Sequence, residues 1–265
     1  MDALRQVDSW EAGRAAAGVA RAGGIVATHG ATDEPYPWAS ITKPATALAV
    51  LVAAEEGTLD LDEPAGPPGS TVRHLLAHAS GLPFREGGAT GRPGARRIYS
   101  NHGFLVLGEH VGARAGMPFA DYLREAVLEP LGLGCTFDGH PGSGLHGSLD
   151  DLLTLGREWL APTLVSPETF AEATSVQFPG LDGVIPGVGR FNPNDWGLGF
   201  ELKDGKPGHW AGTRTSPRTF GHFGGSGTFL WADPDAGVAL GCLTDREFGP
   251  WALEVWPAFS DAVLA

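Results

Sequence analysis

A serine and a lysine three positions apart open a long apolar segment near the N-terminus. Ser40 and Lys43 lie in WASITKPATALAVL, residues 38–51. A serine hydroxyl is a weak nucleophile that needs a base, and helix positions i and i+3 share one face, about 5 to 6 Å apart at Cβ. Lys43 is the only Lys or Arg between Arg21 and Arg73, and burial would lower its pKa. We hypothesise that Ser40 is a nucleophile with Lys43 as its base; the alternative is a serine that caps a helix.

A second group of polar residues precedes another apolar segment. Tyr99 and Asn101 occur in RRIYSNHGFLVLGEHV, residues 96–111. A tyrosine near a cationic lysine could have a lowered pKa and relay protons. An asparagine offers donors and an acceptor that could hold the lysine or a substrate amide. The alternative is a loop tyrosine beside a capping asparagine.

A third group lies near the C-terminus, in TFGHFGGSGTFLWADPD, residues 219–235. There His222, Phe223 and Gly224 are followed by Gly225 and then by a predicted strand. Clustered glycines let a backbone approach a ligand closely and leave N–H groups exposed as donors. The alternative is a glycine-rich bulge before a strand.

The three groups occur in the order S-x-x-K, Y-x-N and H-x-G, and TVRHLLAHASGL (residues 71–82) lies between the first two. In these motifs the sequence resembles the serine β-lactamase-like, penicillin-binding-protein-like family. The branch that it resembles has Y-x-N as its second motif and contains class C β-lactamases, DD-peptidases and related esterases. The resemblance covers nearly the whole chain.

The resemblance implies an acylation–deacylation cycle. Ser40 would become acylated, Lys43 would act as the base or tune the serine, and Tyr99 would be the second proton relay. It also implies a set of substrate-binding and oxyanion residues. These are Asn101, His222 in place of the K-T-G lysine, Phe223, Gly224 and Gly225, whose N–H would form the oxyanion hole with that of Ser40.

Two positions depart from the pattern of the carboxylate-binding members. Phe223 stands where a threonine is common, and Gly225 carries no hydroxyl. Arg214 and Arg218 lie upstream and could supply a cation. The departures favour neutral esters or small amides, so we expect an esterase-like serine hydrolase. The alternatives are a β-lactamase or D-Ala-D-Ala carboxypeptidase, an acyltransferase, or a non-catalytic binding homologue.

The elements that must position these residues can be read from the pattern. We expect a helix over 2–13, a hairpin over 15–29, a helix over 40–56 ended by Gly57, and a helix in 71–79 capped by Thr71 and ended by Gly81. Further predicted helices cover 102–115, 118–129, 148–160, 167–173 and 250–265, the last interrupted near Pro257; predicted strands cover WGLGFEL (196–202), 228–233 and 237–244.

Sheet pieces at both ends of the chain predict an α/β (α+β) fold of the β-lactamase/transpeptidase type, in which an antiparallel sheet is flanked by terminal helices. Residues 1–45 and 205–265 would form the sheet lobe and 46–204 a mainly helical lobe. We expect the site in the cleft between the lobes, a common location. Trp38, Trp196 and Trp231 could line it.

Composition narrows the range of partners. The 265 residues carry a formal net charge of −13, so nucleic acid and anionic membranes are poor partners, and we expect a small-molecule ester or amide. Cys135 and Cys242 are predicted to be free thiols. No signal peptide is recognised, which predicts a cytoplasmic protein. No cofactor or metal is expected, because His74 and His78 have metal-like spacing but no obvious third ligand.

Overall fold

A six-stranded antiparallel sheet forms the centre of the fold. The computed structural model describes residues 2–265. In spatial order the strands are β2 (Gly24–Gly30), β1 (Ala15–Arg21), β12 (Val238–Thr244), β11 (Thr228–Asp233), β10 (Phe220–Gly224) and β9 (Glu201–Leu202). The hairpin predicted over 15–29 is present, and the strands predicted over 228–233 and 237–244 pair as β11 and β12. Strand β1 pairs with β12, so the two ends of the chain share one sheet. The predicted fold class is confirmed.

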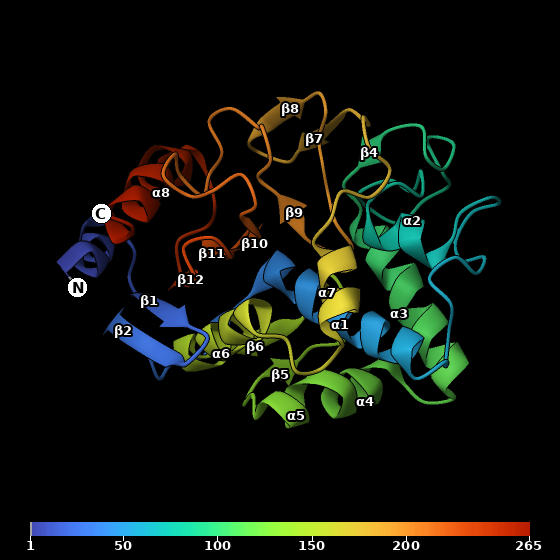
Figure 1. Cartoon of the computed structure of the whole chain (residues 1–265), viewed down its shortest axis with the longest axis horizontal. Helices are drawn as coiled ribbons and strands as arrows, with labels where there is room; N and C mark the ends of the chain where they lie inside the picture. The colour runs from blue at the N-terminus through green and yellow to red at the C-terminus, as the bar shows by residue number, and fades with distance from the viewer. Residues whose placement is uncertain (1) are drawn as a thin grey trace.

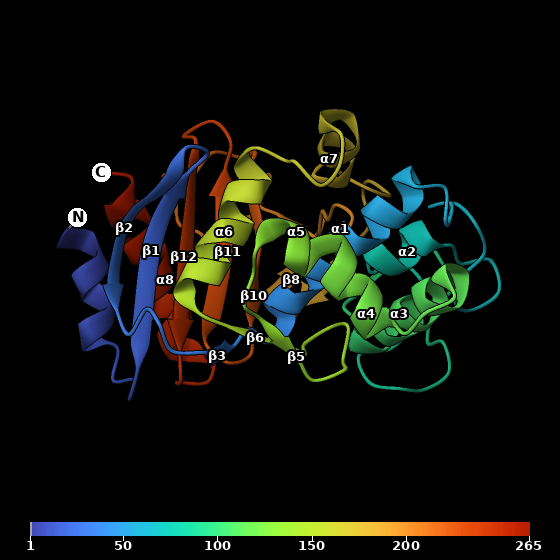
Figure 2. The same cartoon turned by 90° about the horizontal axis from the view of Figure 1, so that it is seen from below.

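Helices cover both faces of this sheet (Figure 2). One face packs against α6 (Leu149–Leu160), and the other against α8 (Pro250–Val263) and the 3₁₀ helix η1 (Asp2–Ser9). Because side chains alternate along a strand, Leu240 and Cys242 of β12 belong to the apolar cluster under α8.

Three glycines allow α6 to lie close to the sheet. A Cβ at Gly18 would be 2.5 Å from Leu153 Cδ1, and one at Gly241 would be 3.0 Å from Leu152 Cδ2. On the helix itself, a Cβ at Gly156 would be 3.0 Å from the Cβ of Ala239. Both surfaces therefore lack side chains where they meet.

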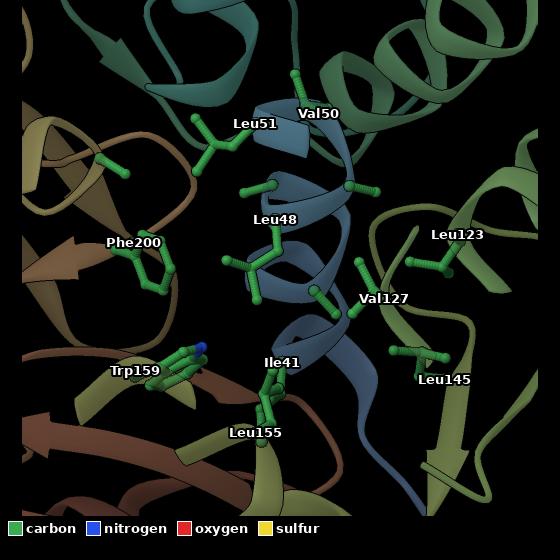
Figure 3. Close-up of a cluster of buried hydrophobic side chains, with 14 of the residues drawn as sticks. Ile41, Leu48, Val50, Leu51, Leu123, Val127, Leu145, Leu155, Trp159 and Phe200 are labelled. Carbon is green, nitrogen blue, oxygen red and sulfur yellow. The ribbon is translucent and has the colours of Figure 1, made fainter. Parts of the chain in front are cut away.

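Helix α1 (Thr42–Glu55) runs through the middle of the molecule and is buried on nearly all sides. Figure 3 shows Leu48 directed toward Phe200 and the side chains of Val127 and Leu145 on the opposite side of the helix. A helix that is apolar all round is expected at such a position. Its mostly apolar surroundings set the environment of Lys43.

The remaining helices lie on the side of the molecule away from β1 and β2 (Figure 1). They are α2 (Val72–Leu76), α3 (Asn101–Ala115), α4 (Phe119–Leu123), the π-helical turn η3 (Arg124–Leu128), α5 (Glu129–Leu131) and α7 (Pro167–Ala173). Thr71 caps α2 by accepting the backbone N–H of His74, as predicted. Gly57 follows α1 with φ 74°, the left-handed conformation that ends a helix.

Short strands and one 3₁₀ turn complete the fold. Two three-stranded sheets, with spatial orders β3-β6-β5 and β4-β7-β8, were not predicted. Their strands are β3 (Tyr36–Pro37), β5 (Thr136–Phe137), β6 (Leu145–Gly147), β4 (Arg97–Ile98), β7 (Gly183–Ile185) and β8 (Gly189–Phe191), and the turn is η2 (Ala39–Ile41). Strands this short give little periodic signal.

Several predicted boundaries were wrong. The first helix ends at Ser9 rather than near residue 13, and α2 ends at Leu76, well before Gly81. The chain turns back after α2 because His78 adopts φ 54° and its carbonyl accepts the N–H of Ile98. Helix α8 continues through Pro257, since buried residues on either side of the proline hold it against the sheet. In WGLGFEL only the last two residues form a strand.

The predicted helical region also contributes to the sheet side of the molecule. Helix α6 lies within residues 46–204 and packs against β1, β11 and β12, and β9 adds an edge strand to the sheet. The division of the chain into a sheet lobe (1–45 and 205–265) and a helical lobe (46–204) therefore remains a prediction.

Candidate active site

Ser40 lies in the tight turn η2 rather than inside the helix. The residue before it, Ala39, has φ 45°, a left-handed conformation that costs an alanine about 1–2 kcal/mol. The turn is closed by a bond from the N–H of Ile41 to the carbonyl of Trp38 (3.1 Å). Strain of this kind persists where the surrounding structure enforces it, and it is common next to functional side chains.

Strand β10 is part of that enforcing structure. A Cβ at Gly224 would lie 2.5 Å from the carbonyl oxygen of Trp38 and 3.0 Å from the Cβ of Ala39. The end of the strand therefore touches the turn that carries Ser40, and only glycine fits there. At Gly225, by contrast, a Cβ would meet nothing within 4 Å.

Lys43 is fully buried, 0% exposed. Its Nζ lies 2.6 Å from Asn101 Oδ1, 2.8 Å from the carbonyl oxygen of Gly142 and 3.2 Å from Ser40 Oγ. Burial holds the pKa of Lys43 well below its usual value of 10.5, as the sequence predicted. A neutral amine has two N–H donors and one lone pair. Since the amide oxygen and the carbonyl can only accept, an amine in its neutral form would have its lone pair available for the hydroxyl of Ser40.

Tyr99 faces both Lys43 and the third motif. The Nζ of Lys43 lies 4.8 Å from the centre of its ring, and its hydroxyl is 3.4 Å from Nε2 of His222. Burial raises the pKa of Tyr99 well above 10, and a hydrogen bond with Ser40 offsets part of this effect. The expectation of a lowered tyrosine pKa was wrong, because burial disfavours the charged phenolate more than the hydrogen bond with Ser40 favours it.

His222 is buried on β10 and is neutral. Burial lowers its pKa to about 3. Its Nδ1 donates to the carbonyl of Phe223 at 2.7 Å, so Nε2 carries the lone pair and accepts from Tyr99. Ser40, Lys43, Tyr99 and His222 thus lie together in one polar group.

His78 holds the segment that carries Tyr99 and Asn101 in place. Nδ1 of that histidine accepts the backbone N–H of Ser100 at 3.2 Å, and its ring lies 4.5 Å from the ring of Tyr99. Ser100 itself caps α3 by accepting the N–H of Gly103 at 2.7 Å. These contacts fix where the tyrosine and asparagine side chains leave the loop.

A pocket of 140 Å³ opens over Ser40. Its polar lining comes from Ser40, Tyr99, His222 and Gly225, and its apolar lining from Phe84, Ile185, Pro186, Trp196, Phe223 and Phe248. The structure thus brings together residues from all three motifs. The pocket is small and apolar, which suits a short uncharged group next to the serine.

Phe223 has a structural role besides lining the pocket. It is 8% exposed, and its ring packs 4.7 Å from Phe248 and 5.5 Å from Trp210 in the cluster under α8. Because β10 alternates, His222 points to the opposite face, toward Tyr99. Phe223, which stands where a threonine is common in the carboxylate-binding members, is therefore part of the core.

Other sequence candidates lie elsewhere. Arg218 pairs with Asp235 at the surface, and Arg214 does not line the pocket. Trp38 and Trp231 are core residues, so only Trp196 of the three predicted tryptophans reaches the pocket.

Three further observations concern two histidines, the cysteines and the lengths of the helices. His74 and His78 bind different partners. Nδ1 of His74 lies 2.9 Å from Thr71 Oγ1, whereas Nδ1 of His78 accepts the backbone N–H of Ser100. Cys135 and Cys242 are free, as predicted. No helix within residues 2–265 is long and apolar enough to cross a membrane.

Two parts of the site were missed at the sequence level. One is the Gly142 carbonyl, a backbone group that leaves no signal in side-chain types. The other is Glu201 on β9, which accepts from Nε1 of Trp210 at 2.7 Å and from Nε2 of His209 at 3.0 Å, and lies 3.6 Å from Nζ of Lys206. Glu201 pairs with Gly221 next to His222 on β10. The sequence indicated this site only through a charged residue, Glu201, in the otherwise apolar predicted strand WGLGFEL.

Comparisons with known proteins match the chain over nearly its full length. A family model described as Beta-lactamase matches residues 7–263. The solved structure of a beta-lactamase from Mycobacterium bovis superposes with a TM-score of 0.97 and 54% identity, covering 99% of this chain and 98% of that one.

Two curated proteins are more distant relatives. Esterase EstB of Burkholderia gladioli is 25% identical over an alignment of 338 positions, which covers 88% of this chain and 83% of the esterase. Penicillin-binding protein 4* of Bacillus subtilis (strain 168) is 29% identical over 135 residues. That match covers 38% of this chain and only 30% of the penicillin-binding protein.

Proposed function

Because this chain belongs to the Beta-lactamase family, whose members are serine hydrolases, we propose that it cleaves an ester or small amide through an acyl-Ser40 intermediate. The observation that carries the proposal is the environment of Lys43. A fully buried lysine with a lowered pKa and its Nζ 3.2 Å from a serine hydroxyl is equipped to take a proton. A lysine kept only for stability would be expected to pair with a carboxylate.

In the acylation step, Lys43 Nζ takes the proton of the Ser40 hydroxyl while Oγ forms a bond to the substrate carbonyl carbon. The carbonyl oxygen becomes an oxyanion, which the N–H groups of Ser40 and Gly225 would stabilise by roughly 3–4 kcal/mol each. When the tetrahedral intermediate collapses, the bond to the leaving group breaks. Tyr99 gives its proton to the departing oxygen or nitrogen, and the proton on Lys43 restores the phenol.

Deacylation repeats these steps with water. Lys43 removes a proton from the water, directly or through the hydroxyl of Tyr99, as the water oxygen bonds to the acyl carbon. Ser40 Oγ then leaves and regains that proton. His222 would keep the hydroxyl of Tyr99 oriented, since Nε2 accepts from it at 3.4 Å. Asn101 would hold the amine of Lys43 in place through the 2.6 Å contact.

The lining of the pocket supports an ester with a short apolar part. Six apolar residues surround Ser40, and neither Phe223 nor Gly225 offers a hydroxyl to a substrate carboxylate at the third motif. The similarity to esterase EstB agrees with this preference. An alcohol or amine in place of water would make the same enzyme an acyltransferase.

One observation favours a second candidate, a β-lactamase. The Mycobacterium bovis protein, which is 54% identical, is described as a beta-lactamase, and penicillin-binding protein 4* adds a weaker indication of β-lactam binding. The absence of hydroxyls at positions 223 and 225 argues against that activity.

A kinetic comparison tests the proposal. Wild type and Ser40→Ala are assayed with 4-nitrophenyl hexanoate and with nitrocefin, and Tyr99→Phe serves as a second variant. We expect ester hydrolysis that is lost in Ser40→Ala and is reduced about 100-fold or more in Tyr99→Phe. Nitrocefin turnover exceeding ester turnover would favour the β-lactamase, and ester turnover that survives in Ser40→Ala would exclude Ser40 as the nucleophile.

A further inference from the structure

A second, larger hollow adjoins the pocket over Ser40. It has a volume of 360 Å³ and is lined by β4, the β7–β8 region and the loop before β4. Phe84, Tyr99 and Pro186 line both hollows. A substrate held at Ser40 can therefore extend past Tyr99 into this second space, which we call the outer pocket. Figure 1 shows β4 on the same side of the molecule as β7 and β8.

The walls of the outer pocket expose apolar side chains. Phe84 is 44% exposed and Val184 is 52% exposed, and both are among the few large apolar residues that face solvent. Ile98 and Pro186 add to the same lining. Exposed apolar residues gathered in a hollow beside a reactive group indicate a surface that a ligand covers.

The outer pocket is also positively charged. Arg96, Arg97 and Arg190 line it against a single acidic residue, Asp182. The lining thus carries a formal charge of +2 in a chain whose net charge is −13. The segment 85–97, which leads into this lining, has four arginines and one glutamate. A cationic hollow on an acidic protein concentrates anions at that place.

The three arginines differ in what they already bind. Arg97 is buried and donates to the carbonyls of Ala77 at 2.7 Å and Asn194 at 3.0 Å, and Arg190 pairs with Asp182. Arg96 is exposed and has no acceptor within residues 2–265. A guanidinium has five N–H donors arranged to bind a carboxylate or phosphate, and those of Arg96 are unused.

We propose that the substrate is an ester or amide in which an apolar segment separates the reactive carbonyl from an anionic group, a carboxylate or phosphate, and that Arg96 binds this anion in the outer pocket. The inference rests on the hydrolase function proposed above and adds a substrate class to it. The anion can belong to the acid part or to the alcohol part of the substrate. It binds away from the third motif, whose position 225 lacks a hydroxyl.

Matched pairs of esters test the proposal. For the acid part, 4-nitrophenyl monoadipate is compared with 4-nitrophenyl hexanoate; for the alcohol part, 3-carboxyphenyl hexanoate is compared with 3-carbamoylphenyl hexanoate. We expect wild type to prefer the anionic member of one pair by about five- to tenfold in kcat/KM, the contribution of one charge-assisted bond at a partly exposed site. The preference should fall as salt is added.

The variants Arg96→Gln and Arg92→Gln distinguish direct binding of the anion by Arg96 from attraction of the anion by the overall positive charge of segment 85–97. Both remove one exposed arginine of segment 85–97, but only Arg96 lines the outer pocket. Arg96→Gln should abolish the preference by lowering kcat/KM for the anionic esters, and Arg92→Gln should retain the preference. Equal turnover of both members of each pair by wild type, or a preference that survives in Arg96→Gln, overturns the outer-pocket proposal alone. A lack of Ser40-dependent turnover of any ester overturns the hydrolase function and this inference together.

Discussion

The contact between Gly224 and the turn that carries Ser40 predicts that a side chain at position 224 would displace the nucleophile. Replacing Gly224 by alanine would place a Cβ 2.5 Å from the carbonyl oxygen of Trp38, 2.5 Å from Thr228 Oγ1 and 3.0 Å from the Cβ of Ala39. Ordinary contacts of a Cβ begin near 3.4 Å. The Trp38 oxygen is a backbone atom, so it cannot rotate away, and β10 and the turn must separate by about 1 Å.

The size of the effect follows from this displacement. Overpacking of this kind costs about 1–3 kcal/mol, which corresponds to a fall in Tm of roughly 3–9 °C for a chain of this length. Moving a reactive group by about 1 Å can cost around 100-fold in rate. Gly224→Ala should therefore remain folded at 25 °C while Ser40 reacts about 100 times more slowly.

Two measurements check the prediction: thermal unfolding, and the rate at which a fluorophosphonate labels Ser40. The control is Gly225→Ala, one residue further along, where a new Cβ meets nothing within 4 Å. That variant should keep the wild-type Tm. A Gly224→Ala variant with both the Tm and the labelling rate of wild type would refute the claim that β10 sets the position of the turn.

Three further predictions concern stability. Burial lowers the pKa of Lys43, so between its folded-state pKa and pH 10.5 the unfolded chain binds a proton that the folded chain lacks. The free energy of unfolding therefore falls as pH falls through this window. Lys43→Met should remove this slope and stabilise the protein at neutral pH, which urea unfolding across pH measures. Burial would raise the pKa of Glu201, but His209 and Lys206 hold it at about 2. Its contribution is therefore complete above pH 4.5 and lost as pH falls toward 2, and Glu201→Gln should flatten this acid limb and cost about 3–5 kcal/mol. Phe223→Thr should cost roughly 3 kcal/mol in urea unfolding because the ring is in the core, and a Tm equal to wild type would contradict that placement.

The motif residues were predictable because their signals are local. Ser40 and Lys43 are three positions apart, and the lack of other cations around Lys43 indicated that the lysine would be buried. The hairpins and most long helices followed from periodicity and turn residues. The meeting of the three motifs followed from their resemblance to a family and not from any spacing in the sequence.

Other features depend on contacts between distant segments. The carbonyl of Gly142 and the walls formed by residues 183–191 come from loops without periodic patterns. The direction of the Tyr99 pKa was predicted wrongly because burial of the phenol raises this pKa, and the burial depends on how the fold encloses the side chain. The contact at Gly224 likewise becomes visible only when β10 is placed beside the turn.

Labelling by mass tests the central claim most directly. Wild type and Ser40→Ala are incubated with a fluorophosphonate at neutral pH, the intact mass is recorded, and the modified peptide is identified. One adduct per chain is expected on Ser40 in wild type and none in Ser40→Ala. No adduct on wild type, or an adduct of equal extent on Ser40→Ala, would contradict the assignment of Ser40 as the nucleophile.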